Sequence, residues 1–217
     1  MLSKEKTQEA IHLMAEMFPD AHGELQHENA FQLLIAVILS AQATDVSVNK
    51  ATPALFQAFP TPEALAEAPL EEIIEKIRTI GLYRNKAKNI KACAKMLLTD
   101  FEGKIPKTRE ALMQLPGVGR KTANVVLGDA FGVPGIAVDT HVERVSKRLR
   151  ICKLNATVLE VEETLMRKLP KETWVDAHHT MIFFGRYHCT ARAPKCASCP
   201  LLFMCQEGKE RMKGKIN

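Results

Sequence analysis

The stretch Leu115-Pro-Gly-Val-Gly-Arg-Lys-Thr-Ala123 decides the fold, because it predicts a tight hairpin between two helices. Glycine adopts backbone conformations that other residues avoid, so Gly117 and Gly119 are expected to shape the hairpin and leave its N–H groups open to a ligand. A helix that begins near Gly119 would add its positive end. Taken alone, the pattern favours a plain turn with a solvated lysine, and a phosphate grip with the amine of Lys121 beside it becomes the preferred interpretation only together with a second site at the far end of the chain.

Four cysteines gather near the end of the sequence with the spacing Cys-x6-Cys-x2-Cys-x5-Cys, namely Cys189, Cys196, Cys199 and Cys205. No apolar signal segment precedes the opening residues, which predicts a cytoplasmic protein whose thiols stay reduced and bind metal instead of pairing. Four thiolates suit tetrahedral zinc or a [4Fe-4S] cluster. Zinc sites usually show two short cysteine pairs, so the single Cys-x2-Cys favours the cluster, with zinc as the alternative.

The hairpin with Lys121, the following Val138-Asp-Thr-His-Val142 and the four-cysteine tail, taken in order, resemble the endonuclease III family. That family belongs to the helix-hairpin-helix superfamily of DNA glycosylases, and the resemblance covers nearly the whole chain. It implies a base-excision-repair enzyme that removes oxidised pyrimidines from duplex DNA and also cuts at abasic sites, as a bifunctional glycosylase and AP lyase. Lys121 and Asp139 match the family's catalytic lysine and aspartate.

Apolar residues recur at helical spacing nearly everywhere, for example at Ile73, Ile74, Ile77 and Ile80, while alternation with a period of two is almost absent. The chain is therefore expected to be all-α. Its longest apolar run, residues 31–39, is far shorter than the roughly 20 residues of a membrane helix and predicts a buried core helix.

Helix ends have their own signals in this sequence. Thr61 before a proline, Thr108 and Asn155 are expected to begin helices as N-caps, and Gly81 is expected to end one. The basic tail, residues 209–217, is expected to be disordered.

The resemblance implies two lobes with a DNA-binding cleft between them. One lobe, residues 22–132, would be a helical barrel that carries the helix-hairpin-helix near 108–131. The other would combine residues 1–21 with 133–217 and end in the iron-sulfur loop, residues 189–205.

The charge distribution supports a phosphate-binding partner. The net charge of +5 arises in the second half, because residues 1–110 carry 13 Lys+Arg and 15 Asp+Glu, and residues 111–217 carry 17 and 10. A positive half is typical of proteins that bind the DNA backbone. The basic residues Arg144, Lys147, Arg148 and Arg150 suggest either a phosphate track or, as the preferred interpretation, a solvated face.

The chemistry that the resemblance implies starts with Lys121, whose neutral amine would attack the sugar of a flipped nucleotide and expel the base. The resulting imine permits β-elimination of the 3′ phosphate. Free lysine has a pKa of about 10.4, so burial and nearby cations would have to lower it. Asp139 would stabilise positive charge on the sugar and assist proton transfer, and it is also a favoured helix N-cap.

Several residues are candidate DNA contacts. Gln42 would face the orphaned partner base, Leu82 would wedge the stack, and Asp45 would border the flipped base. Without the resemblance, Gln42 would be a helix-end amide, Leu82 a core leucine and Asp45 a helix cap. The remaining candidates flank the hairpin or Asp139: Pro116, Gly117, Val118, Gly119, Arg120, Thr140 and His141. His141 is either a partner that organises the Asp139 loop or a satisfied buried histidine.

Two other functions compete with this interpretation. A monofunctional adenine glycosylase of the same superfamily generally lacks the lysine and carries a further C-terminal domain, whereas this chain has Lys121 and stops soon after Cys205. A non-catalytic DNA-binding module would use the hairpin and the metal loop as grips only. A monovalent cation at the hairpin carbonyls of Leu115 and Val118 is a further possibility, and a monomer that acts on damaged or abasic duplex DNA, without a membrane, is expected.

Overall fold

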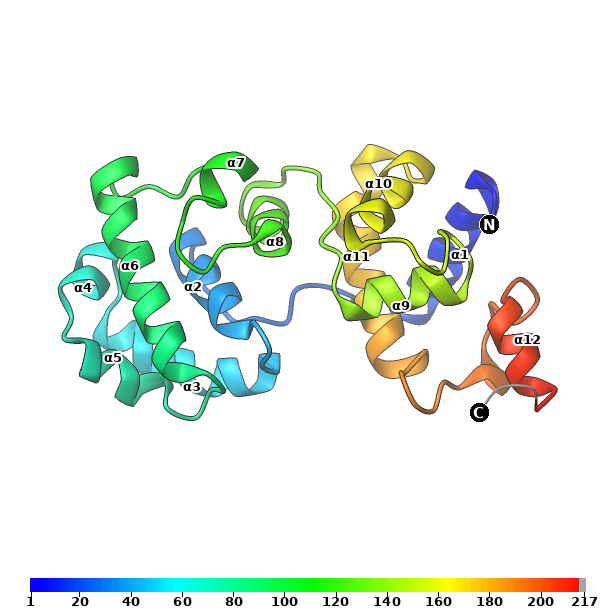
Figure 1. The fold of residues 1–217 in the computed structure, drawn as a ribbon, viewed down its shortest axis with the longest axis horizontal. Coiled ribbons are helices and arrows are strands. Elements are labelled where there is room, and N and C mark those ends of the chain that lie inside the picture. The colour runs from blue at the N-terminus through cyan, green and yellow to red at the C-terminus, as the bar shows by residue number, and fades with distance from the viewer. Residues whose placement is uncertain (215–217) are drawn as a thin grey trace. The chain divides into compact units, whose positions relative to one another are not determined.

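The computed structural model describes residues 1–214, and this part of the chain is entirely helices and loops, as expected for an all-α protein. The chain divides into two compact units, residues 24–133 and residues 1–23 with 134–217 (Figure 1). These ranges lie close to the two lobes that the resemblance implied.

The unit of residues 24–133 is built around one apolar helix. Every residue of α2 from Phe31 to Leu39 is buried, as predicted for a core helix, and α2 packs against α3, α6 and α8. The predicted apolar face Ile73, Ile74, Ile77 and Ile80 is also buried. The helices of this unit are α2 (Ala30–Ser40), α3 (Asp45–Ala58), α4 (Pro62–Glu67), α5 (Leu70–Ile77), α6 (Tyr83–Phe101), α7 (Arg109–Leu112) and α8 (Arg120–Phe131).

Short polar side chains set most helix starts. Thr61 and Thr108 cap α4 and α7, as predicted, each accepting a hydrogen bond from the backbone N–H three residues later. Asn155 does not cap α10. Thr157 does so in a capping box with Glu160, because a reciprocal pair satisfies two backbone N–H groups where Asn155 would satisfy one.

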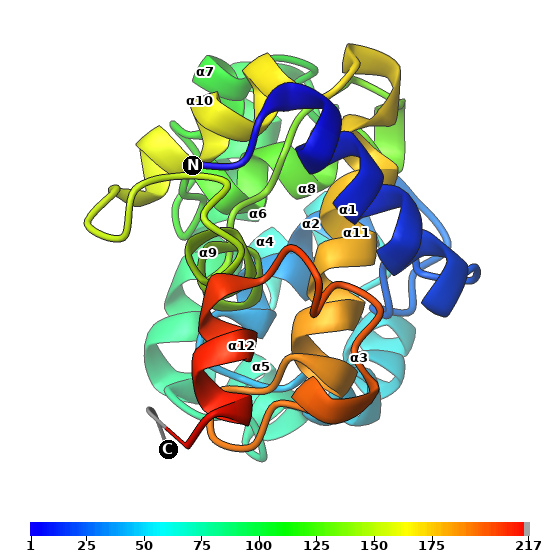
Figure 2. The same ribbon diagram turned by 90° about the vertical axis from the view of Figure 1, so that its right-hand side faces the viewer.

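The other unit joins the first helix to the second half of the chain. In it, α1 packs against α10 and α11 (Figure 2). Its core contains Met14, Val142, Leu165 and Phe184. The elements are α1 (Lys4–Met17), α9 (Thr140–Arg148), α10 (Val158–Lys168), η1 (Lys171–Thr173), α11 (Trp174–Phe183), the π-helical η2 (Phe184–His188), η3 (Cys196–Ser198) and α12 (Gln206–Met212).

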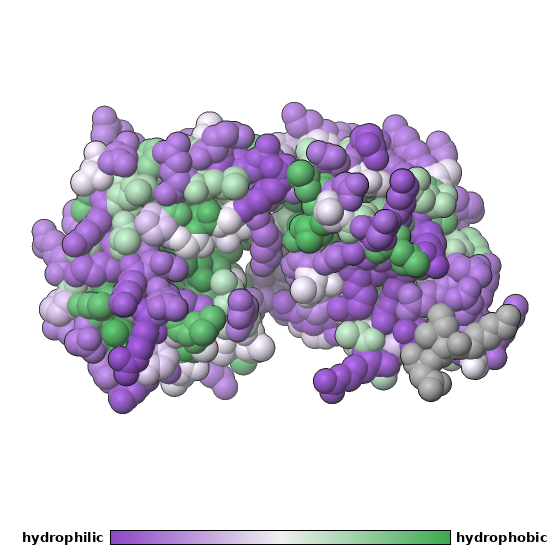
Figure 3. Space-filling model, in the orientation of Figure 1, coloured by the Kyte–Doolittle hydropathy of each residue, from purple (hydrophilic) through white to green (hydrophobic). Residues whose placement is uncertain are grey.

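The C-terminal tail corrects one expectation. Residues 206–212 form α12, held by the Arg211–Glu207 ion pair at 2.9 Å, so disorder from residue 209 is wrong for the described part; residues 215–217 lie outside it. None of the helices in residues 1–214 has the length and apolar composition of a membrane span. Hydrophilic residues cover much of the face in Figure 3, with hydrophobic patches between them.

Candidate functional site

The hairpin between α7 and α8 requires glycine at Gly117. Its φ is +83°, a left-handed conformation that other L-residues rarely adopt. A Cβ at this position would lie 2.9 Å from Ile38 Cγ2 and 3.2 Å from Asn89 Cβ. Both conformation and space therefore exclude a side chain, and the hairpin packs closely on α2 and α6.

Gly119 serves a different purpose from the one expected. Its φ of −96° is open to any residue, so the prediction of a special conformation is wrong for Gly119. It is the N-cap of α8, no side chain caps the helix, and a Cβ there would meet no atom within 4 Å. The positive end of α8 thus remains uncovered by any capping side chain, which suits a phosphate.

Lys121 lies in the first turn of α8, and its side chain is exposed. The burial that was expected to desolvate this amine is therefore absent from the protein itself. Arg120 and Pro116 beside it are half-buried. The amine projects from the same hairpin that offers the uncapped helix end.

Val118 is buried inside the turn, and its N–H donates to the Leu115 carbonyl at 3.1 Å. The two residues of the predicted cation site are thus joined by the hydrogen bond that closes the hairpin turn. The cation itself stays a prediction.

Gln42 and Leu82 share two unusual properties. Both are exposed, Leu82 by 57%, and both have left-handed backbones although neither is glycine, with φ of 53° and 61°. The alternative of Leu82 as a core leucine is therefore wrong. Such conformations cost about 1–3 kcal/mol each and concentrate at functional sites.

The two loops that carry these residues are neighbours. A Cβ at Gly81 would lie 4.0 Å from the Gln42 carbonyl oxygen. Gly81 itself does not end α5, which stops at Ile77, and Leu82 instead takes the left-handed conformation. Ile38 lies one turn before Gln42 and Asn89 lies two turns after Leu82, so the helices that carry these two loops are also the helices that pack against the hairpin.

Asp45 follows Gln42 by three residues and is the first residue of α3. Thr44, and not Asp45, caps that helix, since its hydroxyl accepts a hydrogen bond from Ser47 N at 3.2 Å. The proposed cap role of Asp45 is therefore wrong, and its contact with a flipped base stays a prediction.

In the other unit, Asp139 caps α9 as predicted. Its Oδ1 accepts hydrogen bonds from His141 N at 2.8 Å and Val142 N at 2.9 Å, while Oδ2 takes no part in these bonds. The extended loop 133–138 leads into the cap, and buried Val138 anchors its end. The exposed Thr140 follows. The carboxylate is thus held by one oxygen at a helix N-terminus.

His141 is half-buried and bonded to Arg144. Its Nδ1 lies 3.1 Å from Arg144 Nη2, which donates to the Gly185 carbonyl at 2.7 Å. A Cβ at Gly185 would lie 2.8 Å from His141 Cβ, so α9 and η2 approach closely. Burial, and then the charge of Arg148, lower the pKa of the Arg144 guanidinium. The fully buried alternative for His141 is therefore wrong, and its role as a partner that organises the Asp139 loop stays a prediction.

The basic residues of α9 do not form the solvated face that was preferred. Arg148 is only 8% exposed, and Lys147 pairs with Glu143 at 2.5 Å. The sequence pattern misses this because it does not reveal which backbone carbonyls lie nearby.

All four cysteines of the tail line one cavity. Cys189 follows η2, Cys196 and Cys199 bracket η3, and Cys205 caps α12 with its sulfur 3.3 Å from Gly208 N. Other walls come from Arg148, Phe184, Leu201 and Leu202. A cysteine-lined pocket with apolar walls and N–H donors to sulfur fits a metal centre.

Burial raises the pKa of the Cys199 thiol to about 11, and burial also raises the pKa of Cys196 and Cys205. A bound metal reverses this preference, because it stabilises thiolates. A cation bound in this cavity would therefore lower the pKa of these thiols and deprotonate them. Cys93 and Cys152 are buried elsewhere and do not line this cavity.

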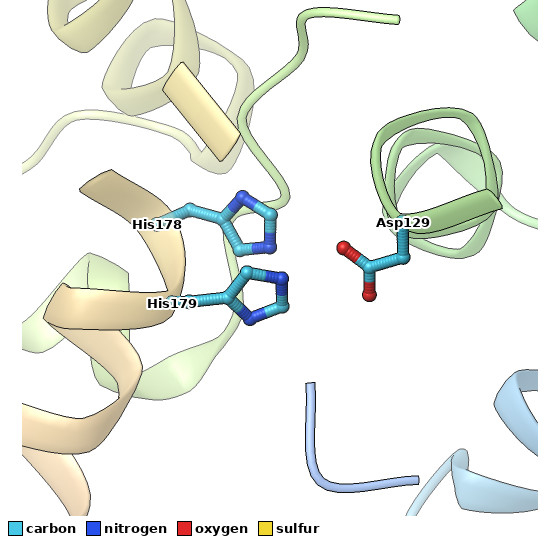
Figure 4. A group of neighbouring side chains, drawn as sticks. All are labelled: Asp129, His178 and His179. Atoms are coloured by element: carbon cyan, nitrogen blue, oxygen red, sulfur yellow. The ribbon is translucent and has the colours of Figure 1, made fainter. Parts of the chain in front are cut away.

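Sequence reasoning missed two adjacent buried histidines on α11, His178 and His179. Their ring centroids lie 4.0 Å apart at an angle of 39° (Figure 4). Asp129, also drawn there, belongs to the last turn of α8 in the other unit. An isolated His-His pair within a helical pattern gives no signal of burial, because either face of the helix could hold it.

A family model described as "HhH-GPD superfamily base excision DNA repair protein" matches residues 35–171. The chain belongs to this superfamily of base excision DNA repair proteins.

Sequence comparison with curated relatives identifies the family within this superfamily. The chain is 57% identical over 213 residues to endonuclease III of Bacillus subtilis (strain 168), covering 98% of this chain and 97% of the relative. It is 48% identical over 211 residues to endonuclease III of Escherichia coli (strain K12), covering 97% and 99%. The resemblance to the endonuclease III family, and with it the class of base excision repair enzyme, is confirmed.

A solved structure agrees over nearly the whole chain. One described as "Structure of a Trapped Endonuclease III-DNA Covalent Intermediate: Estranged-Adenine Complex" is 60% identical, with a TM-score of 0.95, and covers 98% of this chain and 100% of that one. DNA as the partner of this chain is confirmed as well.

Proposed function

We propose that this chain is a DNA glycosylase with AP lyase activity that removes oxidised pyrimidines through a Schiff base on Lys121. The observation that carries the proposal is the exposed Lys121 in the first turn of α8, beside a hairpin whose Gly117 has no room for a side chain. The similarity to a trapped endonuclease III–DNA covalent intermediate supports a covalent step.

Lys121 acts as the nucleophile. Its neutral amine forms a bond to the anomeric carbon while the glycosidic bond breaks, and the base leaves with the bonding electrons and gains a proton. Opening of the sugar gives an imine, which makes the C2′ proton acidic. Loss of that proton breaks the C3′–O bond and releases the 3′ phosphate, and water then frees the lysine.

The exposed side chain of Lys121 is accessible to a bound nucleotide. A duplex that covers the hairpin would exclude water from this amine while it attacks the sugar. The uncapped end of α8 would hold the neighbouring phosphate during the attack.

Asp139 is the second proposed catalytic residue and acts as a carboxylate. One oxygen is committed to the α9 cap, and the other is proposed to stabilise positive charge on the sugar and to accept or return protons. The cap fixes the orientation of the group, so positioning and electrostatics come from one side chain.

Gln42 and Leu82 fill the space that the flipped base leaves. Their exposed, left-handed positions on neighbouring loops support this role, because the strained backbones hold both side chains out toward solvent. The side chain of Leu82 and the amide of Gln42 would enter the base stack together. Asp45 would lie beside the flipped base.

The four-cysteine cavity is proposed to hold a [4Fe-4S] cluster, and Cys189, Cys196, Cys199 and Cys205 would be its ligands. All four cysteines line one cavity with the apolar side chains of Phe184, Leu201 and Leu202. Zinc sites usually show two short cysteine pairs, so the single Cys-x2-Cys favours the cluster. When bound, the cluster supplies a covalent brace for the loop that carries Arg192 and Lys195. About four irons per chain and visible absorption are expected, whereas a colourless zinc protein would contradict this assignment.

Borohydride trapping tests the lyase proposal. Reduction with abasic duplex DNA should link the unaltered protein covalently to DNA, and Lys121→Ala should abolish the adduct while DNA binding persists. Lys76→Ala, which removes an exposed lysine on α5, is the matched control and should trap normally.

The same experiment separates the competing functions. A monofunctional glycosylase would excise bases without forming the adduct, and a binding module would do neither. Absence of an adduct with the unaltered protein would discard the Lys121 mechanism. Excision assays over a panel of oxidised pyrimidines and mispairs would then define the substrate. Such an enzyme would work as a monomer on chromosomal DNA in the cytoplasm.

A further inference from the structure

Arg148 is a buried charge at the C-terminal end of α9. It is 8% exposed, and its Nε forms an ion pair with Glu207 Oε1 at 2.8 Å. Burying a guanidinium is costly unless its donors are satisfied. The groups that satisfy the donors of Arg148 therefore indicate which part of the chain this side chain fixes.

The partners lie on the segment that follows the first cysteine. Nη1 donates to the Thr190 carbonyl at 2.7 Å, and Nη2 donates to the Ala191 carbonyl at 2.8 Å. Nη1 also lies 3.4 Å from both the carbonyl oxygen and the sulfur of Cys189. One planar group thus fixes three consecutive residues and touches a metal-ligating sulfur.

Glu207 extends the same network to the last cysteine. It lies two residues after Cys205 on α12 and also accepts from Arg211 Nε at 3.1 Å. Arg148 therefore joins the chain after the first cysteine to the helix after the last one. Those two connections close the loop around the cavity.

The bond to Cys189 has an electronic consequence. An N–H donor to a ligating sulfur stabilises the more negative state of a cluster, and so raises its reduction potential. Cys205 receives a comparable bond from Gly208 N at 3.3 Å. Cys199 also accepts a backbone hydrogen bond, from Leu201.

We propose that Arg148 is a positioning residue for the metal centre, which fixes the backbone of residues 189–191 and raises the reduction potential through its bond to the Cys189 sulfur. This inference rests on the iron-sulfur centre proposed above. It assigns a role to a side chain outside the cysteine motif and outside the proposed catalytic pair.

Two variants test the assignment in the full chain. Arg148→Lys keeps the charge but replaces the planar set of donors with one amine. The double variant R148M/E207Q removes both members of the charge pair, so its net charge is unchanged; it loses the bonds from Arg148 to the loop together with the Arg211–Glu207 pair. Arg78→Lys changes an exposed arginine on the other unit, paired with Glu75 at 3.3 Å, and is the matched control.

The measurements are iron per chain, helix content and the reduction potential of the cluster. Both test variants should retain helix content and show either loss of iron or a lower potential. The expected shift is about tenfold in the ratio of reduced to oxidised cluster at fixed potential, which is about 59 mV for one electron. Arg78→Lys should match the unaltered protein.

One result would contradict the proposed cluster, and a different result would contradict the role of Arg148. An unaltered protein without iron would remove the proposed cluster itself. A normal cluster in the unaltered protein, with iron content and potential unchanged in either folded test variant, would refute the role of Arg148 alone.

Discussion

Replacing Gly117 with alanine should destabilise the protein through two effects that the structure separates. The left-handed φ of +83° costs an alanine about 1–2 kcal/mol. The new Cβ would lie 2.9 Å from Ile38 Cγ2 and 3.2 Å from Asn89 Cβ, which is overpacking worth about 1–3 kcal/mol. Together these predict a loss of about 2–5 kcal/mol in the free energy of unfolding.

Gly119→Ala is the matched control two residues away. Its φ is −96° and no atom lies within 4 Å of the new Cβ, so only the poorer N-cap remains, at below about 1 kcal/mol. Urea unfolding followed by circular dichroism would measure both variants. Equal midpoints for Gly117→Ala and Gly119→Ala would refute the argument, because the two glycines would then be interchangeable.

Three further substitutions have expected outcomes. Leu82→Gly should stabilise the protein by up to about 1 kcal/mol in thermal unfolding, because glycine adopts a φ of 61° without strain. Base excision should fall, because the variant lacks the side chain that wedges the stack. A lower stability of the variant would contradict the argument that the Leu82 backbone is strained. Lys86→Met should raise stability at neutral pH by about 1–3 kcal/mol, since the Lys86 amine is buried without a hydrogen-bond partner. Burial lowers the pKa of Lys86 in the folded protein. The free energy of unfolding of the unaltered protein should therefore be highest above about pH 10.4 and should fall as the pH falls through the lowered pKa. Unfolding curves from neutral to alkaline pH should show this pH dependence in the unaltered protein, and Lys86→Met should remove it. Asp139→Asn keeps the capping oxygen, so unfolding should change by less than about 1 kcal/mol while turnover is lost, and normal turnover with unchanged stability would remove Asp139 from the catalytic assignment.

The sequence was sufficient for features that depend on local chemistry. Helical periodicity predicted the buried helix 31–39, and threonine before proline predicted the start of α4, because burial and capping follow from neighbouring residue types. The capping role of Asp139 was predictable for the same reason. The ordered motifs then led to the family that the comparisons confirmed.

Features that depend on distant contacts were not predictable. Nothing near Leu82 in the sequence indicates a left-handed leucine, since Gly81 beside it is the residue that local rules would choose. Asn155 was expected to begin α10, but the reciprocal bonds between Thr157 and Glu160 place the cap two residues later. Arg148 looked solvated because its carbonyl partners lie more than 40 residues further along the chain.

The motif residues and the residues that fix their geometry are different sets. Ile38 and Asn89 leave room at Gly117 for glycine alone, and Arg148 holds the backbone beside Cys189, yet none of these three belongs to a recognisable motif. A close-packed interior transmits a change at such a position to the loop it supports, because neighbouring atoms have no space to absorb it. A chain could therefore keep every motif residue and still lose function through a change at Ile38 or Arg148.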